Sequence, residues 1–414
     1  MKILIVNTFD IYGGAARAAH RLHRSLLGQG IDSQMLVQYK RSDDETVITE
    51  KSKIYKFFNN LRPIIDAIHL YPYRNKTKAF FSSSWFPHRS IVDRINEIDP
   101  DIVHLHWICL GMIKIEDLSK INAPIVWSLH DMWAFTGGCH YDDECGLYHA
   151  QCGNCKVLRS KKEKDLSRKI FKRKSDVFSQ MKNLTIVGLS KWLTECSKQS
   201  SLLKNHRHIN LPNPIDTTVF CAVEKTEARK MFNLPQDKKL VLFGAVNSTE
   251  DPRKGFKELC AALHQLQSDD IELVVFGNAK EDQDQDFGFK THYLGHINND
   301  MELVNLYSAA DVMVVPSLQE NLSNAIMESL SCATPVVGFD IGGNSDMIDH
   351  KKNGYVAKPF DTKDLAQGIE WILHNENCAD LRVNARKKVV ATFDSKIVAK
   401  KYIQLYEDIL LEKG

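Results

Sequence analysis

The sequence predicts an α/β protein with two large domains, each built on a parallel sheet. Short apolar runs bounded by glycine, proline or polar residues alternate with amphipathic stretches, as strands and helices do in such sheets. The chain has 414 residues, and domains hold roughly 100–200 residues each. Polar residues directly follow several apolar runs, which places them at the sheet edge where α/β proteins bind ligands.

The composition is that of an ordinary soluble protein, with 43% hydrophobic and 26% charged residues. The net charge is only +2, so we expect no nucleic-acid partner. No apolar run approaches the ~18 residues that a membrane-spanning helix needs. The first residues predict a strand rather than a signal peptide, because Asn7 and Asp10 interrupt the apolar run. We therefore expect a cytoplasmic protein whose ten cysteines are reduced or metal-bound.

The chain begins with a predicted strand at residues 2–7, a loop at 8–14 and a helix from Ala15. Gly13 and Gly14 stand directly before this helix, where glycine lets the backbone approach a ligand closely. The dinucleotide fingerprint G-x-G-x-x-G is missing. A plain tight turn is the alternative to a ligand-binding loop.

The segment from Lys51 to Lys78 mixes basic residues with aromatic and branched apolar ones, a combination that suits a membrane surface. The alternative is a basic loop over an insertion. The residues that carry this prediction are Lys51, Lys53, Tyr55, Lys56, Phe57, Phe58, Arg62, Ile64, Ile65, Tyr71, Arg74, Lys76 and Lys78.

Residues 102–105 and 125–129 predict two buried strands with a helix between them. The second strand runs into His130 and Asp131, where α/β sheets bind ligands. A core histidine satisfied by a neighbour is the alternative for His130. His104 and His106 end the earlier strand and could line the same site.

Four cysteines, Cys139, Cys145, Cys152 and Cys155, form the pattern C-x5-C-x6-C-x2-C. Only the last pair has the close spacing of a zinc knuckle. The pattern predicts a structural zinc site that holds a loop; the alternatives are reduced cysteines or an adventitious disulfide. The following segment, Lys156 to Lys174, holds ten basic residues against two acidic ones, and predicts either a solvated helix or a second contact with anionic lipid.

The second half opens with a predicted strand at 240–245, followed by Arg253, Lys254 and Gly255 and a half-buried helix. Further strands at 271–276 and 291–294 and a helix at 299–309 continue the alternation. After them come a strand at 312–315, a polar loop at 317–322, a helix that Ser323 or Asn324 could cap, and a strand at 336–339. A strand at 354–356 and three amphipathic helices, the last at 395–411, complete the chain.

Glu320 lies in the loop before this capped helix, and Glu328 lies about one turn inside it. Both carboxylates can face one cleft, beside the backbone N–H groups of a helix N-terminus that would stabilise an anion such as a diphosphate. A carboxylate pair at such a site suits a ligand with a phosphate and several hydroxyls. The alternative is that both glutamates are solvated surface charges.

These residues and those that follow resemble the signature of family 4 of the retaining glycosyltransferases, which have the two-domain GT-B fold. The resembling elements are Glu320-x7-Glu328, Pro335 to Phe339 and Gly342-Gly343-x-x-Asp346. The resemblance implies that Glu320 contacts the donor sugar and that Glu328 binds the ribose of the nucleotide. It also implies that the backbone of Asn321, Leu322 and Ser323 reaches the sugar and diphosphate.

The resemblance extends to the other candidate residues. It implies that His130 contacts the donor sugar from across the cleft, with Asp131 orienting or charging the same pocket, and that Gly13 and Gly14 line the cleft. It assigns Lys254 to the donor diphosphate. Relatives often carry an arginine directly after the strand's glycine, whereas Ala245 follows Gly244 here, so Arg253 is expected to supply the second cation.

The fold expected from the resemblance is GT-B, in which two Rossmann-like domains face a deep interdomain cleft. The run from Leu211 to Asp216 is similar to the family's linker, so we assign residues 1–212 to an acceptor domain and 213–393 to a nucleotide-sugar donor domain. In this fold the last helix, within 394–414, rejoins the first domain.

The resemblance implies a retaining hexosyltransferase that needs no metal for catalysis. The expected donor is a nucleotide sugar, with UDP-glucose as the best guess. The expected acceptor is a saccharide, lipid-linked, of a bacterial surface polysaccharide, reached at the cytoplasmic face of the inner membrane. The alternatives are a nucleotide-sugar epimerase, a sugar phosphorylase or a non-catalytic nucleotide-sugar-binding subunit.

Overall fold

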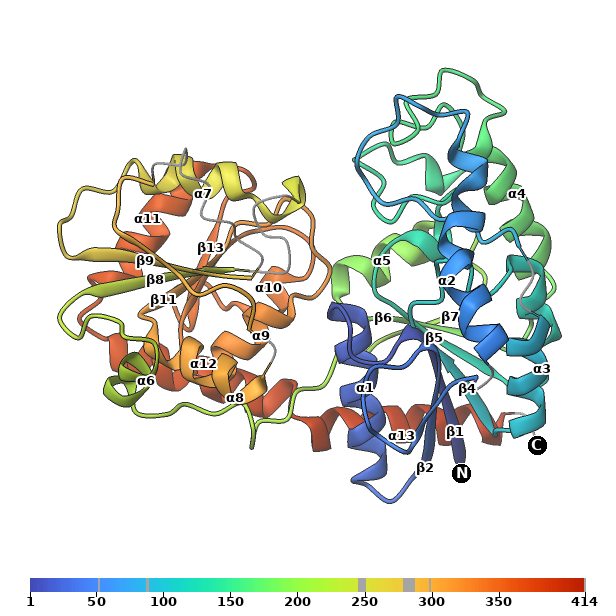
Figure 1. Cartoon of the computed structure of the whole chain (residues 1–414), viewed down its shortest axis with the longest axis horizontal. Coiled ribbons are helices and arrows are strands. Elements are labelled where there is room, and N and C mark those ends of the chain that lie inside the picture. Colours follow the sequence, from blue (N-terminus) through green and yellow to red (C-terminus); the bar gives the residue numbers. More distant parts are fainter. Residues whose placement is uncertain (51–52, 87–88, 245–250, 278–286, 298, 413–414) are drawn as a thin grey trace. The chain divides into compact units, whose positions relative to one another are not determined.

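The computed structural model describes residues 1–50, 53–86, 89–244, 251–277, 287–297 and 299–412 (Figure 1). Lys51 and Ala245, both named above, lie outside these residues, and so do the side chains of Lys53, Tyr55, Lys56 and Phe57. The chain divides into two compact units, Met1–Asn213 with Ala399–Gly414 (unit 1) and Pro214–Val398 (unit 2). From the sequence alone we place these boundaries after residue 212 and before residue 394.

Unit 1 is built on a parallel sheet with the strand order β3-β2-β1-β4-β5-β6-β7. Its strands are β1 (Lys2–Phe9), β2 (Asp32–Tyr39), β3 (Val47–Ile48), β4 (Ile102–Leu105), β5 (Ile125–Leu129), β6 (Leu184–Gly188) and β7 (Arg207–Asn210). Its helices are α1 (Gly14–Leu27), α2 (Lys53–Ala67), α3 (Arg89–Ile98), α4 (Leu166–Phe178) and α5 (Lys191–Gln199). In the central strand β1, residues 3–6 are all fully buried, because a parallel strand of this kind is covered on both faces.

Unit 2 repeats this plan with the strand order β10-β9-β8-β11-β12-β13, again parallel throughout. Its strands are β8 (Lys239–Gly244), β9 (Ile271–Phe276), β10 (Thr291–Tyr293), β11 (Val312–Val315), β12 (Val336–Phe339) and β13 (Gly354–Ala357). Its helices are α6 (Lys225–Met231), α7 (Phe256–Leu263), α8 (Asp300–Ala309), α9 (Asn324–Ser331), α10 (Asn344–Met347), α11 (Thr362–Leu373) and α12 (Cys378–Thr392). The prediction of two parallel-sheet α/β domains is confirmed.

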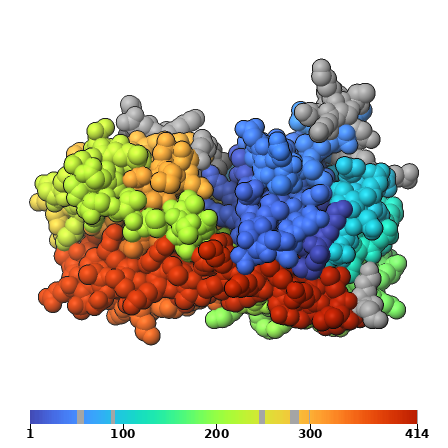
Figure 2. All heavy atoms as spheres, turned by 90° about the horizontal axis from the view of Figure 1, so that it is seen from below, coloured from blue at the N-terminus to red at the C-terminus, as the bar shows by residue number. Residues whose placement is uncertain are grey.

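The last helix, α13 (Ser395–Leu411), begins in unit 2 and continues in unit 1. Figure 2 shows α13 in red on the outer face of unit 1. Tyr402 and Tyr406 lie on its inner side and are buried, with exposed fractions of 1% and 0%. The hydroxyl of Tyr406 is 2.7 Å from His104 Nδ1 at the end of β4, so this part of the helix belongs to the core of unit 1.

Several elements differ from the sequence predictions. No helix was expected between residues 51 and 78, where α2 forms, and the helix expected between β4 and β5 is replaced by a 3-10 turn at Ile115–Lys120. Strands β2 and β7 were not predicted. Polar residues interrupt the apolar run of β2, and β7 is a half-exposed edge strand that reads Arg-His-Ile-Asn.

Two segments of unit 1, one after α2 and one after β5, pack against each other beyond the ends of its strands (Figure 1). Phe81 pairs with Cys139 as an isolated antiparallel bridge, and the backbone N–H of Thr77 donates to the carbonyl of Val157 at 2.9 Å. The segment after α2 and the cysteine-containing segment therefore support one another, next to the sheet edge that carries His130.

Candidate functional site

In unit 2, the loop between β11 and α9 carries Glu320 and lies beside Lys254. Lys254 ends a 3-10 turn, Pro252–Lys254, which Asp251 caps by accepting from the N–H of Arg253. Lys254 Nζ is 2.9 Å from Glu320 Oε2, and the exposed fractions of the two side chains are 27% and 15%. The structure thus joins two of the predicted site residues in a partly buried ion pair, where a charge-assisted hydrogen bond is stronger than one in water.

Glu328 lies on α9 and is only 3% exposed. It is therefore buried, and the alternative of a solvated surface charge is wrong for this residue. Its Oε2 accepts a hydrogen bond of 2.9 Å from the hydroxyl of Tyr307 on α8. Burying a carboxylate costs free energy that such hydrogen bonds only partly offset, which is a feature of functional sites more than of stable cores. Tyr307 is not evident as a site residue from the sequence, because its apolar neighbours indicate only a buried helix.

Two glycines allow the backbone of this loop to take its path. Gly342 has φ +53°, and a Cβ added there would stand 1.7 Å from the carbonyl oxygen of Glu320. Gly255 has φ +69°, and its Cβ would stand 1.7 Å from the carbonyl oxygen of Pro316. Any side chain at either position would push the loop aside, so both glycines help to place Glu320.

The other predicted residues of this loop are close to Glu320. The N–H of Asn321 lies 3.2 Å from Glu320 Oε1, and Leu322 and Ser323 are buried, with Ser323 at the N-cap of α9. Arg253 instead faces Asp251, with its Nη2 2.6 Å from Asp251 Oδ2. Burial would raise the pKa of Asp251, but Arg253 and its backbone N–H lower it overall. The predicted second cation is thus already paired within its own turn.

In unit 1, His130 and Asp131 follow β5 directly, as predicted. His130 Nε2 is 2.9 Å from His106 Nδ1. Desolvation lowers the pKa of His130 to about 4, against the opposing charge of Asp131, so this imidazole is neutral at neutral pH.

Asp131 holds several polar groups around itself. Its Oδ2 accepts from Trp107 Nε1 at 2.9 Å and lies 2.6 Å from His140 Nδ1, and its Oδ1 accepts from the N–H of Trp133 at 2.8 Å. Burial alone would raise the pKa of Asp131, but His140 and these hydrogen bonds lower it overall. Asp131 therefore orders the loop that carries His130.

Gly13 has φ +90°, and no described atom lies within 4 Å of the position that a Cβ would take there. Gly14 begins α1. The left-handed conformation explains a glycine at residue 13, and the open space beside it is consistent with both a ligand-binding loop and a plain turn.

The basic segment 156–174 is not uniformly solvated, and the prediction is wrong for Lys174. This side chain on α4 is fully buried and its ammonium donates to the carbonyls of Trp133 and, at 3.1 Å, of Thr136. Its Nζ also lies 3.8 Å from the centre of the Trp133 ring. Lys174 thus supports the loop after His130 and Asp131, and cannot contact lipid.

The four cysteines of the predicted zinc site are free thiols, of which Cys139, Cys152 and Cys155 are buried and Cys145 is partly exposed. Burial raises the pKa of Cys152 to about 12 and raises the pKa values of the other three thiols as well. Among the described residues, no group of three or more His, Cys, Asp or Glu side chains is arranged to hold a metal ion. The thiols do not form a ligand set here, and the zinc site stays a prediction.

A structural zinc site makes a prediction that can be checked directly. Protein purified without chelators should contain about one zinc per chain, and Cys152→Ser or Cys155→Ser should destabilise the fold, because metal binding is coupled to folding. Cys378→Ser, on a partly exposed cysteine of unit 2, is the matched control. A chain without zinc would leave the four residues as packed, reduced thiols.

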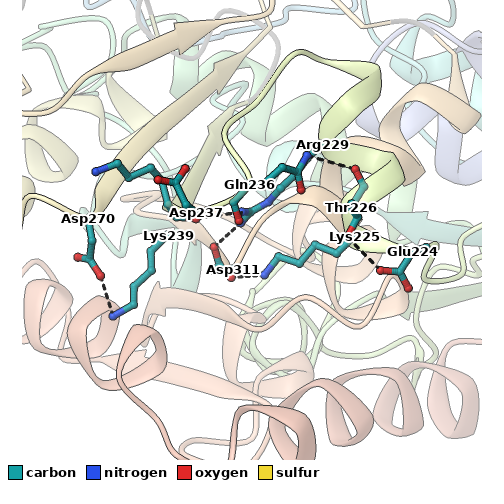
Figure 3. A pocket seen from close by; sticks show the side chains of 10 residues that line it. Glu224, Lys225, Thr226, Arg229, Gln236, Asp237, Lys239, Asp270 and Asp311 are labelled. Atoms are coloured by element: carbon teal, nitrogen blue, oxygen red, sulfur yellow. Dashed lines mark hydrogen bonds and ion pairs between the residues drawn. The ribbon is translucent and has the colours of Figure 1, made fainter.

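Unit 2 also contains a pocket of about 370 Å³, whose lining includes none of Lys254, Glu320 and Glu328 (Figure 3). Asp311, at the amino end of β11, pairs there with Lys225 and with Arg229, whose Nη2 is 2.8 Å from Asp311 Oδ2, and Lys239 pairs with Asp270 at 3.1 Å. These charges are matched within the pocket, and α/β sheets bind ligands at the opposite, carboxyl ends of their strands. We therefore assign this pocket a structural role.

Two family models match the chain. The model for glycosyl transferases group 1 matches residues 224–388, and the model for Glycosyltransferase Family 4 matches residues 12–175. An uncharacterized glycosyltransferase of Methanocaldococcus jannaschii is 25% identical over 331 residues, which cover 74% of this chain and 82% of the relative.

Other named relatives match over about half of their length. N-acetyl-alpha-D-glucosaminyl L-malate synthase of Bacillus anthracis is 23% identical over 48% of this chain and 53% of its own. An N-acetylgalactosaminyltransferase of Campylobacter jejuni, named for N,N'-diacetylbacillosaminyl-diphospho-undecaprenol, is 26% identical over 45% of this chain and 50% of its own.

Solved structures share the fold. Sucrose-phosphate synthase from Thermosynechococcus elongatus superposes with a TM-score of 0.70 at 18% identity, covering 100% of both chains. Anabaena Alr3699/HepE, solved with UDP and glucose, superposes with a TM-score of 0.66 at 15% identity, covering 98% of this chain and 99% of its own.

With its two parallel sheets and these matches, the chain is a glycosyltransferase with the GT-B fold. Its residues 224–388, within unit 2, are similar to the group 1 glycosyltransferases, and its residues 12–175, within unit 1, are similar to Glycosyltransferase Family 4. The enzyme class and the fold expected from the sequence are both confirmed.

Among the described residues, no helix is both long enough and apolar enough to cross a membrane.

Proposed function

We propose that this glycosyltransferase is a retaining enzyme that moves a hexose from a nucleotide sugar, with UDP-glucose as the best candidate, to a saccharide acceptor. The observation that carries the proposal is the ion pair of Lys254 and Glu320 on the loop that leads to the buried Glu328. The family resemblance supports retention. Anabaena Alr3699/HepE, of the same fold, was solved with UDP and glucose, which supports the donor.

Each residue takes a separate part of the donor in this proposal. Lys254 stabilises the negative charge of the leaving diphosphate, as preorganised cations do in transferases. Glu320 lies by the sugar, which gains positive charge as the bond to the diphosphate breaks. Glu328 holds the ribose hydroxyls, and His130 contacts the sugar from unit 1. Lys254 and Glu320 also neutralise one another, with Nζ and Oε2 2.9 Å apart.

A thermal-shift screen of UDP-, GDP- and ADP-sugars tests the proposed donor. A ligand at ~100 times its Kd stabilises a protein by about 2.7 kcal/mol, which such a screen detects. We expect UDP-sugars to give the largest shift, with UDP-glucose foremost. The anomeric configuration of the product, read by NMR, then tests retention. A product of inverted configuration, or stabilisation by none of the sugars, would contradict the proposal.

We expect transfer to persist in EDTA. Lys254 supplies positive charge at the diphosphate, the work that a bound divalent cation does in other transferases. The measurement compares initial rates in EDTA and in added Mg²⁺, with the folded fraction followed by circular dichroism. Turnover that disappears in EDTA while the fold is retained, and returns with Mg²⁺, would overturn the metal-independent mechanism.

We further propose that the acceptor is lipid-linked, in polysaccharide biosynthesis, and that the enzyme works on the cytoplasmic face of the inner membrane. The name of the Campylobacter jejuni relative includes a diphospho-undecaprenol, which supports a lipid-linked acceptor. In unit 1, α2 and the residues after it expose large apolar side chains: Phe58 by 52%, Ile64 by 66%, Ile68 by 54% and Tyr71 by 73%. Arg74, whose guanidinium lies over the Tyr71 ring, adds positive charge to this surface.

This surface predicts binding to anionic vesicles. The protein should float with phosphatidylglycerol vesicles at low salt and be released as salt rises, since each basic residue near such a surface contributes about 1 kcal/mol and salt screens it. The double variant Ile64→Ser, Ile68→Ser should float less, and the same changes at the exposed Val383 and Val390 of unit 2 serve as the control. Protein that stays entirely with the soluble fraction at low salt would refute the membrane contact.

A further inference from the structure

Three histidines at the carboxyl ends of β4 and β5 lie in one row inside unit 1. His104 and His106 are 0% and 3% exposed, their rings are 4.4 Å apart, and the rings of His106 and His130 are 5.1 Å apart. His106 Nδ1 lies 2.9 Å from His130 Nε2. His104 does not bond to His130: its nitrogens lie 2.7 Å from the Tyr406 hydroxyl and 2.8 Å from the Ser128 hydroxyl.

The short distance between His106 and His130 links the tautomers of the two rings. Desolvation lowers the pKa of both imidazoles, with His104 adding to the shift of His106 and Asp131 opposing that of His130, so both rings are neutral. A neutral imidazole has one N–H and one lone pair. If His106 donates from Nδ1, His130 must carry its proton on Nδ1; if His130 donates from Nε2, His106 must carry its proton on Nε2.

The environment of His106 favours the first arrangement. Its Nε2 is buried and has no hydrogen-bond partner among the described residues. A buried N–H without a partner is rare, and an unsatisfied acceptor is less so. The proton of His106 therefore belongs on Nδ1, where His130 Nε2 accepts it.

We infer that His106 is a positioning residue: its Nδ1–H holds His130 Nε2, fixes the ring of His130 and keeps the proton of His130 on Nδ1. The inference rests on the proposed function, because the contact of His130 with the donor sugar is part of that proposal. With its proton on Nδ1, His130 can act toward a sugar oxygen only as a hydrogen-bond donor at that nitrogen, and not as an acceptor.

A histidine with a purely structural role is expected to have hydrogen-bond partners at both ring nitrogens. His104 shows this case, since both of its ring nitrogens are bonded to hydroxyls. His106 leaves one buried nitrogen without a protein partner among the described residues, at a cost that an apolar side chain of similar size would avoid. A cavity of about 10 Å³ beside His106 and His130 is too small for a ligand, so His106 acts through His130.

The side-chain ¹⁵N shifts of the histidines test the tautomer in the intact chain. We expect His130, assigned by its loss in His130→Gln, to be the Nδ1–H form at pH 7.5. The Nε2–H form should become populated in His106→Leu, and the wild-type form should remain in His104→Leu, the matched control. An Nε2–H form in the wild type, or an unchanged His130 in His106→Leu, would overturn the inference, and neither result depends on activity.

Kinetics with the donor found by the screen supply the second readout. His106→Leu should lower kcat roughly 2- to 10-fold, the worth of one hydrogen bond, and His106→Asn should restore most of it, because its amide N–H replaces Nδ1–H. In a His130→Ala background, His106→Leu should change nothing further. Additive losses would show that His106 acts independently of His130. A wild-type chain that transfers no sugar would refute the proposed function but not the ¹⁵N result.

Discussion

Glu328→Gln should raise the donor KM with little change in kcat, whereas Glu320→Gln should mainly lower kcat. The proposed partner of Glu328 is the ribose, which changes little during the reaction, so losing the charge weakens ground state and transition state alike. Glu320 faces charge that exists only as the sugar–diphosphate bond breaks. A charge-assisted hydrogen bond contributes roughly 1.5–3 kcal/mol, so each change should cost about 10- to 150-fold.

Steady-state kinetics with varied donor separate these outcomes. Glutamine preserves the shape of both side chains, and the hydroxyl of Tyr307 can still donate to the residue at 328. Glu302→Gln, on the exposed Glu302 of α8, is the control for a lost carboxylate in unit 2. Wild-type kinetics in both variants would remove this loop from the active site, while exchanged effects would keep the site and reverse the two roles.

Most of the strands that could be predicted from the sequence are those that the fold buries on both faces. The short edge strand β10, predicted at residues 291–294, is an exception, because its residues are only half buried. Residues 102–105, 125–129, 271–276, 312–315 and 336–339 were predicted as strands and are β4, β5, β9, β11 and β12. A continuous apolar run is the direct sign of such a strand. Strand β7 has no such run because it lies at the edge of its sheet, where its residues stay half exposed.

For the candidate site too, one part could be predicted from the sequence and another part could not. Glu320, Glu328 and Lys254 could be named from the chain, but the contact of Lys254 with Glu320 joins residues 66 positions apart. Only the parallel pairing of β8 with β11 brings their loops to one edge.

The burial of Lys174 could have been predicted from the sequence. Lys174 falls in the helical stripe of Leu166, Ile170, Val177 and Phe178 on the buried side of α4. The density of basic residues around it concealed that position.

Gly342→Ala should lower the free energy of unfolding of unit 2 by more than Gly295→Ala does, because only the first substitution creates a steric conflict. An alanine with φ near +53° costs about 1–2 kcal/mol, and the approach of its Cβ to the carbonyl oxygen of Glu320 should add roughly 1–3 kcal/mol. Gly295→Ala is the matched control, because Gly295 has φ +64° and no described atom lies within 4 Å of the place where its Cβ would stand. The measurement is urea unfolding of both variants.

The same pair of variants tests whether the loop must hold Glu320 in place for catalysis. A Cβ at residue 342 would meet backbone atoms of Glu320 and Asn321 and not the Glu320 carboxylate, so Gly342→Ala should displace the loop without removing a charge. If the position of Glu320 beside Lys254 sets the rate, kcat should fall in Gly342→Ala at temperatures where the variant is fully folded, and stay near wild type in Gly295→Ala. Equal stability and equal kcat in the two variants would mean that the loop relaxes around the added methyl group, and that its path does not determine activity.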